Sequence, residues 1–275
     1  MVTTESKHPG GQAAVPRVLI VSEHASVKFG GEAILPWHYF RILRRRGVET
    51  WLVVHERTRS ELVSLLPEEV DRLHFLPDTW FNRTANRVGS RMPHRLAYCT
   101  VGYASRISTQ LAARSMARRL IAEHKVDVVH QPIPVSPREP SLLYGLGVPV
   151  VIGPMNGNMT YPPAFSGGKG DRLVALSRRF SAILHRIMPG KPRADALIVA
   201  NERTRRGLPT GTRGEVVELV ENGVDLALWS PTEVVGPREG STRFIFLGRL
   251  VDWKRVDVLI DALATTSVTD RKSVV

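Results

Sequence analysis

Residues 244–255 read FIFLGRLVDWKR. The stretch begins with a short apolar run, which is typical of a strand buried on both faces of a parallel sheet. Apolar residues then recur at helical spacing from Val256 to Leu263, so we expect a helix to follow. Gly248 allows a tight turn between the two elements. The stretch therefore predicts a strand-to-helix crossover, the unit from which α/β sheets are built.

Two cations of this stretch, Arg249 and Lys254, would lie at the mouth of that crossover. Open α/β sheets bind their ligands there. Cations beside the amino end of a helix favour a diphosphate. A solvated basic turn would have the same spacing, so the residues alone leave both interpretations open.

The motif in full is F-x-F-x-G-R-L-x-x-x-K-R, followed by V-D-x-L-I-D-A-L. It resembles the signature that opens the second domain of family 4 glycosyltransferases, which are retaining enzymes of the GT-B fold. The resemblance implies that Arg249 and Lys254 hold the diphosphate of a nucleotide-sugar donor. One position departs from the pattern, because the family's usual glycine after the lysine is Arg255 here.

Composition sets broad limits on the class of protein. The chain has 275 residues, 43% of them hydrophobic, which suits one large or two ordinary globular domains. No apolar run approaches the length of a membrane span, and the amino end lacks the apolar core of a signal peptide. The single cysteine, Cys99, cannot form an internal disulfide, which fits a reducing cytoplasm. The formal charge of +12 favours anionic partners, although a generally arginine-rich proteome would explain it equally well.

The amino-terminal part predicts the opening of a doubly wound fold. After a flexible tail over residues 1–15, strands are expected at 17–22 and 48–54, with a helix at 33–46 between them. Gly30 and Gly31 precede that helix, where glycines let backbone amides approach an anion, although such a pair is more often a plain turn. In the resembling family a Gly-Gly loop lies under the donor phosphates and beside the acceptor. The resemblance thus makes Gly30 and Gly31 donor-binding residues and Glu32 a catalytic candidate on the acceptor side.

The remaining pattern predicts further alternation of strands and helices. Helices are expected at 61–70, 102–124, 140–146, 171–188 and 202–208, and strands at 72–76, 126–130, 148–152, 194–201 and 216–220.

A second part of the resemblance concerns the carboxyl ends of two predicted strands. His130 ends one of them, and without the family a histidine there is best explained as one held by backbone groups. The pattern D-V-V-H-x-P resembles the family and implies that His130 is catalytic, facing the crevice near the transferred sugar. The later pattern G-P-x-x-G implies that Asn156 and Gly157 lie on the acceptor side.

Two segments are basic at helical spacing. Arg83, Arg87, Arg91 and Arg95 recur every fourth residue, and this face either meets an anionic membrane or simply faces water. The predicted helix at 171–188 is amphipathic and basic, which suits either an ordinary core-facing helix or one lying on a membrane surface.

The expected architecture is α/β and GT-B-like. It comprises a doubly wound parallel-sheet domain over 16–231 on the acceptor side, a linker over 232–241, and the start of a Rossmann-like, donor-binding domain over 242–275. Only the first strand and helix of that second domain are present, and the family's later two-glutamate motif has no counterpart. We therefore expect a chain truncated early in the second domain, with residues after 241 poorly anchored.

The resemblance implies transfer of a sugar from a nucleotide-diphosphate donor to an acceptor hydroxyl with retention, in cell-surface polysaccharide or glycolipid synthesis. It implies no metal or other cofactor, and no His, Cys or carboxylate cluster has metal-ligand spacing. The expected partners are the nucleotide sugar, a saccharide or lipid-linked acceptor and an anionic membrane, and the expected location is the cytoplasm, peripheral at the inner membrane face. One alternative is an inactive fragment that at most binds ligand. The other, a nucleic-acid binder, is suggested by charge alone and lacks any recognisable reading motif, so no nucleic-acid partner is expected.

Overall fold

A computed structural model describes residues 14–29, 31–91, 102–159, 181–221, 223, 226, 244–248, 250 and 254–265. The chain divides into two compact units, residues 1–223 and 224–275. Their elements are β1 (Val18–Val21), α1 (Leu35–Arg45), β2 (Thr50–His55), η1 (Glu56–Thr58), α2 (Arg59–Leu65), η2 (Pro67–Arg72), β3 (Leu73–Leu76), α3 (Trp80–Gly89), α5 (Tyr103–His124), β4 (Val128–Gln131), β5 (Val150–Met155), β6 (Ala196–Val199), α7 (Glu202–Arg205), β7 (Glu215–Glu218) and α8 (Val256–Thr265).

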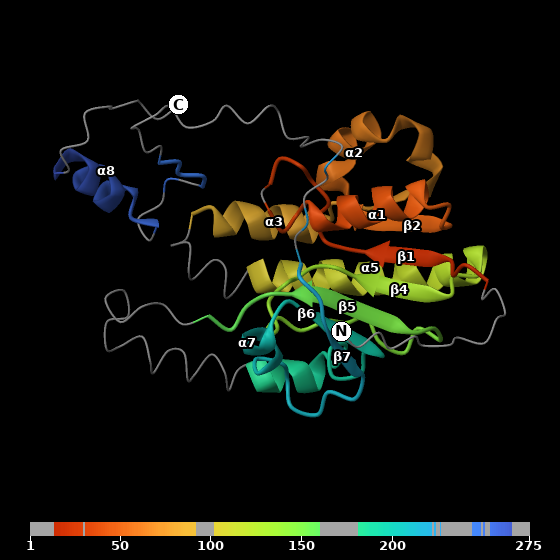
Figure 1. The fold of residues 1–275 in the computed structure, drawn as a ribbon. Coiled ribbons are helices and arrows are strands. Elements are labelled where there is room, and N and C mark those ends of the chain that lie inside the picture. The colour runs from red at the N-terminus through yellow and green to blue at the C-terminus, as the bar shows by residue number, and fades with distance from the viewer. Residues whose placement is uncertain are drawn as a thin grey trace, which may run out of the picture. The chain divides into compact units, whose positions relative to one another are not determined.

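The first unit contains a seven-stranded sheet in the order β3-β2-β1-β4-β5-β6-β7 (Figure 1). Every neighbouring pair of strands is parallel. The chain runs outward from β1 to β3, then returns to the other side of β1 and continues to β7. This reversal defines a doubly wound, Rossmann-like α/β domain, so the predicted fold class is confirmed for the first unit.

Helices cover both faces of this sheet, and the alternation of side chains along each strand decides which helix each residue meets. Ile20 and Leu52 belong to the same buried cluster as Phe40 of α1. Their neighbours Leu19 and Val53 point to the opposite face and share a cluster with Leu120 of α5. Both faces of β1 and β2 are therefore dry, which explains why these strands are continuous apolar runs.

The predicted helix at 33–46 is confirmed as α1, and local chemistry sets its bounds. Pro36 lies in the first turn, where its missing N–H removes no intrahelical bond. Gly47 follows with a φ of 76°, a left-handed conformation that glycine adopts without strain and that commonly ends helices.

The predicted helix at 140–146 is wrong, because this segment is irregular and contains no helical turn. Its backbone finds partners outside itself: the Leu142 amide donates to the side chain of Gln110 at 2.8 Å, and the Gly190 amide donates to the Ser141 carbonyl at 2.8 Å. Leu142 and Leu143 are both buried. Tertiary contacts have thus replaced the helical bonds that the apolar spacing favoured.

The strand predicted at 148–152 is longer than expected and forms β5 through Met155. The register against β6 shifts between Ile152 and Met155, which accommodates Gly153 and Pro154 within the strand. The exit loop therefore begins at Asn156. A smaller correction concerns the helix predicted at 61–70, which is divided into α2 and η2 at Pro67 because proline cannot donate the next helical bond.

The second unit agrees with the sequence in its helix but not in its strand. The predicted helix is confirmed as α8, and none of its residues is buried. Residues 244–247 form no strand, and the exposed fractions of Ile245 and Leu247 are 81% and 97%. A strand requires a neighbour for its backbone groups, and the described part of this unit contains no second strand.

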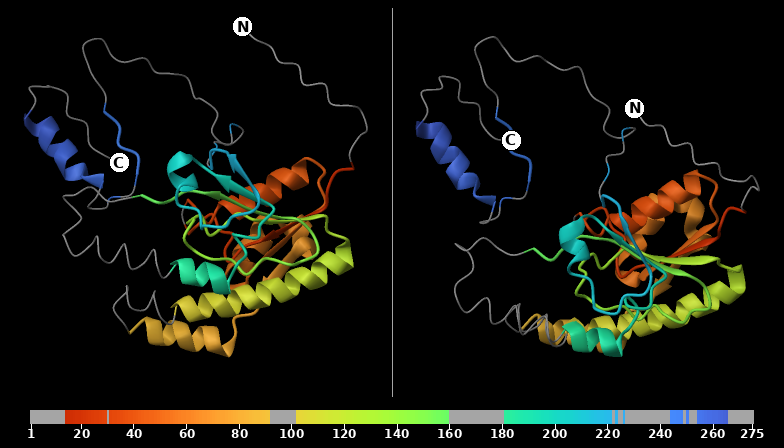
Figure 2. Two further views of the ribbon diagram at one scale, coloured as in Figure 1. Left: turned by 90° about the horizontal axis from the view of Figure 1, so that it is seen from below. Right: turned by 60° about the horizontal axis from the view of Figure 1, so that its bottom comes forward.

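Several expectations fall outside the described residues, namely Gly30, Arg249, Arg95 and the linker at 232–241. The helix expected at 171–188 is described only from residue 181, and residues 181–187 are helical. Along the described helices, none is both long and apolar enough to cross a membrane. Figure 2 shows α3 lying beside α5 on one face of the sheet.

Candidate functional site

The topology places a crevice at the carboxyl ends of β1 and β4. These strands are neighbours in the sheet, and the chain leaves them in opposite directions. In open α/β sheets such a switch point is where ligands bind, because the two departing loops splay apart. The candidate site is therefore built from the segments that follow β1, β4 and β5.

The loop after β1 is held in place by a side chain from α2. Ser26 Oγ donates to Glu61 at 2.7 Å, and the Val27 amide donates to the other oxygen of Glu61 at 2.8 Å. This anchored loop leads to Gly31, where a Cβ would meet no atom within 4 Å. The Gly31 backbone is thus open to an approaching ligand, as an anion-binding turn requires.

Two carboxylates from separate segments, Glu139 and Glu221, lie near Glu32. Burial raises the pKa of Glu32, and the charges of Glu139 and Glu221 raise it further. Glu139 forms an ion pair with Arg106 at 2.8 Å, whereas Glu221 accepts a hydrogen bond from Asn156 at 2.6 Å. Glu32 lies at the surface, so it is the member of this group that a substrate can reach. A carboxyl group with a raised pKa is suited to exchanging protons near neutral pH.

His130 lies near the carboxyl end of β4 and is 8% exposed. Its Nε2 donates to the carbonyl of Gly153 at 2.7 Å, and its ring packs edge-on against Tyr39, with 4.6 Å between centroids. Burial lowers the pKa of His130 to about 4. The imidazole is therefore neutral at pH 7 and held by a backbone group, and any part in catalysis must use it as a neutral hydrogen-bonding group.

Asn156 and Gly157 connect the loop after β5 to α7. Asn156 Oδ1 accepts from Arg203 at 3.0 Å, and the Gly157 amide donates to Thr204 Oγ1 at 3.1 Å. Thr204 is itself bonded to Asn201, the residue that caps α7. A Cβ on Gly157 would lie 2.7 Å from Pro137, so only glycine fits without a shift. These residues shape the rim of the site through their mutual bonds.

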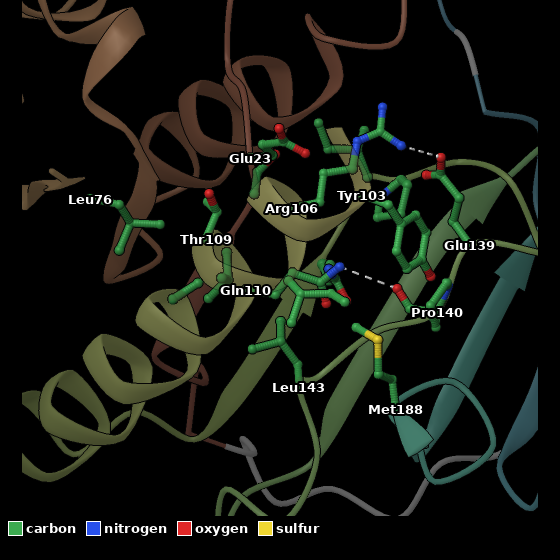
Figure 3. A pocket seen from close by; sticks show the side chains of 17 residues that line it. Glu23, Leu76, Tyr103, Arg106, Thr109, Gln110, Glu139, Pro140, Leu143 and Met188 are labelled. Carbon is green, nitrogen blue, oxygen red and sulfur yellow. Dashed lines mark hydrogen bonds and ion pairs between the residues drawn. The ribbon is translucent and has the colours of Figure 1, made fainter. Parts of the chain in front are cut away.

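Figure 3 shows a cavity beside α5 at the ends of β1 and β4. Arg106 reaches across it to Glu139, and Gln110 donates to the Pro140 carbonyl. Its free volume is about 40 Å³, which is room for a few waters but far below the size of a small-molecule site. In this conformation the cavity is too small for a sugar.

Arg106, Glu139 and Glu221 were not predicted as site residues. Arg106 stood out in the sequence only as one of several basic residues of a long helix. Glu221 could have been predicted as a site residue, because it follows a predicted strand and the carboxyl ends of parallel strands meet at one edge of the sheet. Glu139 could not have been predicted, because it belongs to an irregular segment that only tertiary contacts position.

The residues expected to bind the donor are only partly described. Lys254 is exposed and lies two positions before the first residue of α8. Its predicted partner Arg249 and the predicted Gly30 lie outside the described residues. Gly31, Glu32, His130, Asn156 and Gly157 all belong to the first unit, and Glu32, Asn156 and Glu221 are joined there by the interactions given above.

Comparison with known proteins gives limited information. No family model matches the chain, and no curated protein matches it. Among solved structures, the crystal structure of MurG from Acinetobacter baumannii is similar at 13% identity and a TM-score of 0.37. The match covers 79% of this chain and 50% of that one, so this chain spans about half the length of its structural neighbour. A likeness of this strength carries no argument about function, and the fold assignment rests on the sheet itself.

Proposed function

We propose that this chain is a glycosyltransferase that moves a sugar from a nucleotide-diphosphate donor to an acceptor hydroxyl with retention of configuration. The observation that supports this most is the grouping of Glu32 and Asn156 around Glu221 in the segments that follow the strands of the doubly wound sheet. It coincides with the positions that the sequence resemblance assigns to the reaction. The resemblance further implies that the transfer uses no metal.

The sequence resemblance supports the roles of the donor-site residues, and burial and charge support those of Glu32 and His130. Arg249 and Lys254 stabilise the diphosphate as it leaves, since preorganised positive groups act most strongly where charge develops. The resemblance also gives Gly30 and Gly31 a donor-binding role. Glu32 assists the acceptor hydroxyl as a general base, because burial and the charges of Glu139 and Glu221 raise its pKa. His130 is neutral and orients the sugar rather than carrying a proton.

The acceptor we propose is a saccharide or lipid-linked saccharide, met at the cytoplasmic face of a membrane. The outer face of α3 supports this. Arg83 and Arg87 are exposed there, together with Trp80, whose exposed fraction is 73%, and Arg91 is exposed just after the helix. A basic face with an exposed tryptophan suits an anionic lipid surface, where each cation contributes roughly 1 kcal/mol.

Cosedimentation with vesicles containing an anionic lipid tests this membrane contact. The bound fraction should fall in the double variant Arg83→Gln/Arg87→Gln, but not in the control Arg118→Gln/Arg119→Gln on α5.

The direct test is donor-dependent turnover, followed as release of nucleoside diphosphate from a panel of nucleotide sugars. Loss of one charge-assisted contact removes about 1.5–3 kcal/mol. Arg249→Ala should therefore lower turnover roughly ten- to over a hundredfold, whereas Arg119→Ala on the exposed face of α5 should not change it. An unchanged rate in Arg249→Ala would remove Arg249 from the donor site.

Glu32 offers a second test in the same assay. Glu32→Gln should lower turnover and abolish the rise of the rate with pH that deprotonation of Glu32 produces. Glu218→Gln, an exposed carboxylate on β7, is the matched control. If Glu32→Gln keeps both the rate and its pH profile, Glu32 is not the acceptor-side base.

Ligand binding without turnover is a second candidate function. It is favoured by the second unit, where α8 buries no side chain and residues 244–247 are not paired in a sheet. A rise in melting temperature with UDP or GDP, together with no release of diphosphate from any nucleotide sugar, would support this reading over the transferase.

A further inference from the structure

A second pocket shares the 133–140 loop with the cavity described above. Adjacent residues of this loop serve the two sites: Glu139 pairs with Arg106 in the cavity described above, whereas Arg138 lines the second pocket. The other walls come from the helical segment 181–187 and the turn at 206–211. The pocket volume is about 870 Å³, large enough for an organic ligand.

The charge of the pocket lining is one-sided. Arg138, Arg186 and Arg206 contribute guanidinium groups, and the described residues that line the pocket include no carboxylate. Arg138 is oriented by a hydrogen bond to Asn158 at 2.9 Å. Arg206 is held at 3.1 Å by Glu202, which lies outside the lining. Oriented guanidinium groups form two parallel bonds to phosphate or carboxylate oxygens, so this lining favours an anion.

His185 places an imidazole ring in the wall of the pocket. It lines the pocket and is only 5% exposed. Hydrogen bonds with the backbone of Pro137 and Arg138 raise the pKa of this ring, whereas burial and the charge of Lys191 lower it, to about 4 overall. An anion bound in the pocket would favour the protonated form of the ring.

A buried lysine lies beside the same wall. Lys191 is fully buried next to the lining residue Pro192, and its Nζ donates to the Ser136 carbonyl. Burial lowers its pKa to about 7, and its charge contributes to lowering the pKa of His185. The nearest carboxylate acting on it, Glu139, is shared with Arg106. The region around Lys191, beside the pocket, therefore carries little negative charge.

We propose that this pocket binds the phosphate or diphosphate group of a ligand, held by Arg138, Arg186 and Arg206 beside His185. A phosphate has enough oxygens to engage three guanidinium groups at once, which a single carboxylate does not. The site is separate from the crevice and does not depend on glycosyl transfer. The phosphate belongs either to a soluble ligand or to a lipid headgroup, since the chemistry that binds both is the same.

The test uses inorganic pyrophosphate as the probe and calorimetry on the whole chain. Pyrophosphate should bind, and Arg186→Gln and Arg206→Gln should each weaken binding roughly tenfold or more, as loss of one charge-assisted contact does. Both arginines are exposed, so these variants should fold, which the melting temperature checks. Arg119→Gln on α5 makes the same charge change away from the pocket and should bind as the parent does. If pyrophosphate does not bind, or if all three variants are weakened equally, the pocket is not a phosphate site.

Two further measurements sharpen the result. The imidazole NMR signals of His185 should shift on adding pyrophosphate and its pKa should rise, because an anion favours the protonated ring. Signals that do not move would contradict binding beside His185.

Vesicles containing phosphatidic acid identify the source of the phosphate. Retention of the chain on them, displaced by pyrophosphate and lost in Arg186→Gln, assigns the pocket to a headgroup, and pyrophosphate binding without retention assigns it to a soluble ligand.

Discussion

Two apolar segments of this chain differ in structure, one forming a buried strand and the other remaining unpaired and exposed. Val18–Val21 is a central strand in which no residue is more than 7% exposed. Residues 244–247 are equally apolar and are followed by a confirmed helix, yet Ile245 is 81% exposed and pairs with no strand. The difference lies in the neighbours, because β1 has β2 on one side and β4 on the other. An apolar run becomes a strand only where other strands accept its backbone bonds and helices cover its faces.

Removing apolar volume should show the largest difference between the two runs. Ile20→Ala leaves a cavity between β1 and α1 and should lower the free energy of unfolding by about 2–5 kcal/mol. Ile245→Ala removes the same atoms from a solvated position and should change it by less than about 0.5 kcal/mol. Urea unfolding followed by circular dichroism measures both. Equal losses would mean that residues 244–247 are buried in solution.

Adding volume at a glycine tests the same contrast in the opposite direction. A Cβ on Gly153 would lie 2.2 Å from the Ile198 carbonyl oxygen, at a φ of 122° that other residues rarely adopt. Gly153→Ala should therefore lower stability by about 3 kcal/mol, combining steric overlap and backbone strain. A Cβ on Gly248 would meet only the ring of Phe246, at 3.3 Å, and the ring can move. The melting temperature of Gly248→Ala should match the parent, and a loss similar to that of Gly153→Ala would show a packed second unit.

Acid should weaken the first unit selectively. The pKa of His130 is about 4 in the fold and near 6.5 when unfolded, so the unfolded state takes up the proton first. The stabilisation from the neutral ring is complete above the unfolded pKa and is lost as pH falls toward 4. His130 alone should lower stability by about 2 kcal/mol between pH 7 and pH 5. Residues 224–275 contain no histidine, so amide protection factors in α8 should not follow this change.

The control for this pH dependence is His130→Gln, whose amide can still donate to the Gly153 carbonyl but does not titrate. Its stability should be flatter between pH 7 and pH 5 than that of the parent chain. If stability depends on pH as steeply in His130→Gln as in the parent chain, another group causes the acid sensitivity. His185 is then the next candidate, because burial also lowers its pKa to about 4.

The smallest expected difference concerns ion pairs. Arg44 in the first unit is mostly buried and donates to Glu69 at 3.0 Å and to the Val48 carbonyl at 3.1 Å. Arg44→Gln should lower stability by about 1 kcal/mol. Arg255 and Asp257 form a pair of similar length at 2.8 Å, but both are more than half exposed. Arg255→Gln should leave the unfolding midpoint unchanged, and a measurable shift would mean that this pair is shielded from water.

The parts of the fold that the sequence predicted share one property, a strong periodic pattern. The strands of the first unit were recognisable because burial on both faces requires continuous apolar runs. α1, α5 and α8 were recognisable from helical spacing. The helix expected at 140–146 shows the limit of such patterns, because its apolar residues are buried by contacts with Gln110, Gln131 and the turn at Gly190 that lie far away along the chain.

The residues of the candidate site also divide into those that the sequence pattern could place and those that it could not. Residues at the ends of strands, such as His130 and Asn156, could be named from the sequence because their place in the sheet follows from the order of the elements. Glu139 and Arg138 could not, since the irregular loop that carries them has no pattern of its own. The tautomer of His130 depends on the Gly153 carbonyl, which lies at the register shift in β5, and its neutral state depends on its burial in the folded domain.

The sequence by itself determined the fold class, because alternating apolar runs and helical periods leave few ways to bury both kinds of element. It also determined which segments end at the ligand-binding edge of the sheet. Only the tertiary structure decided which apolar runs found strand partners, and which charged groups met. The grouping of Glu32 with Glu139 and Glu221 and the pocket lined by Arg138, Arg186 and Arg206 arise from segments far apart in sequence. Local preferences act over a few residues, whereas the packing that positions these groups involves the whole domain.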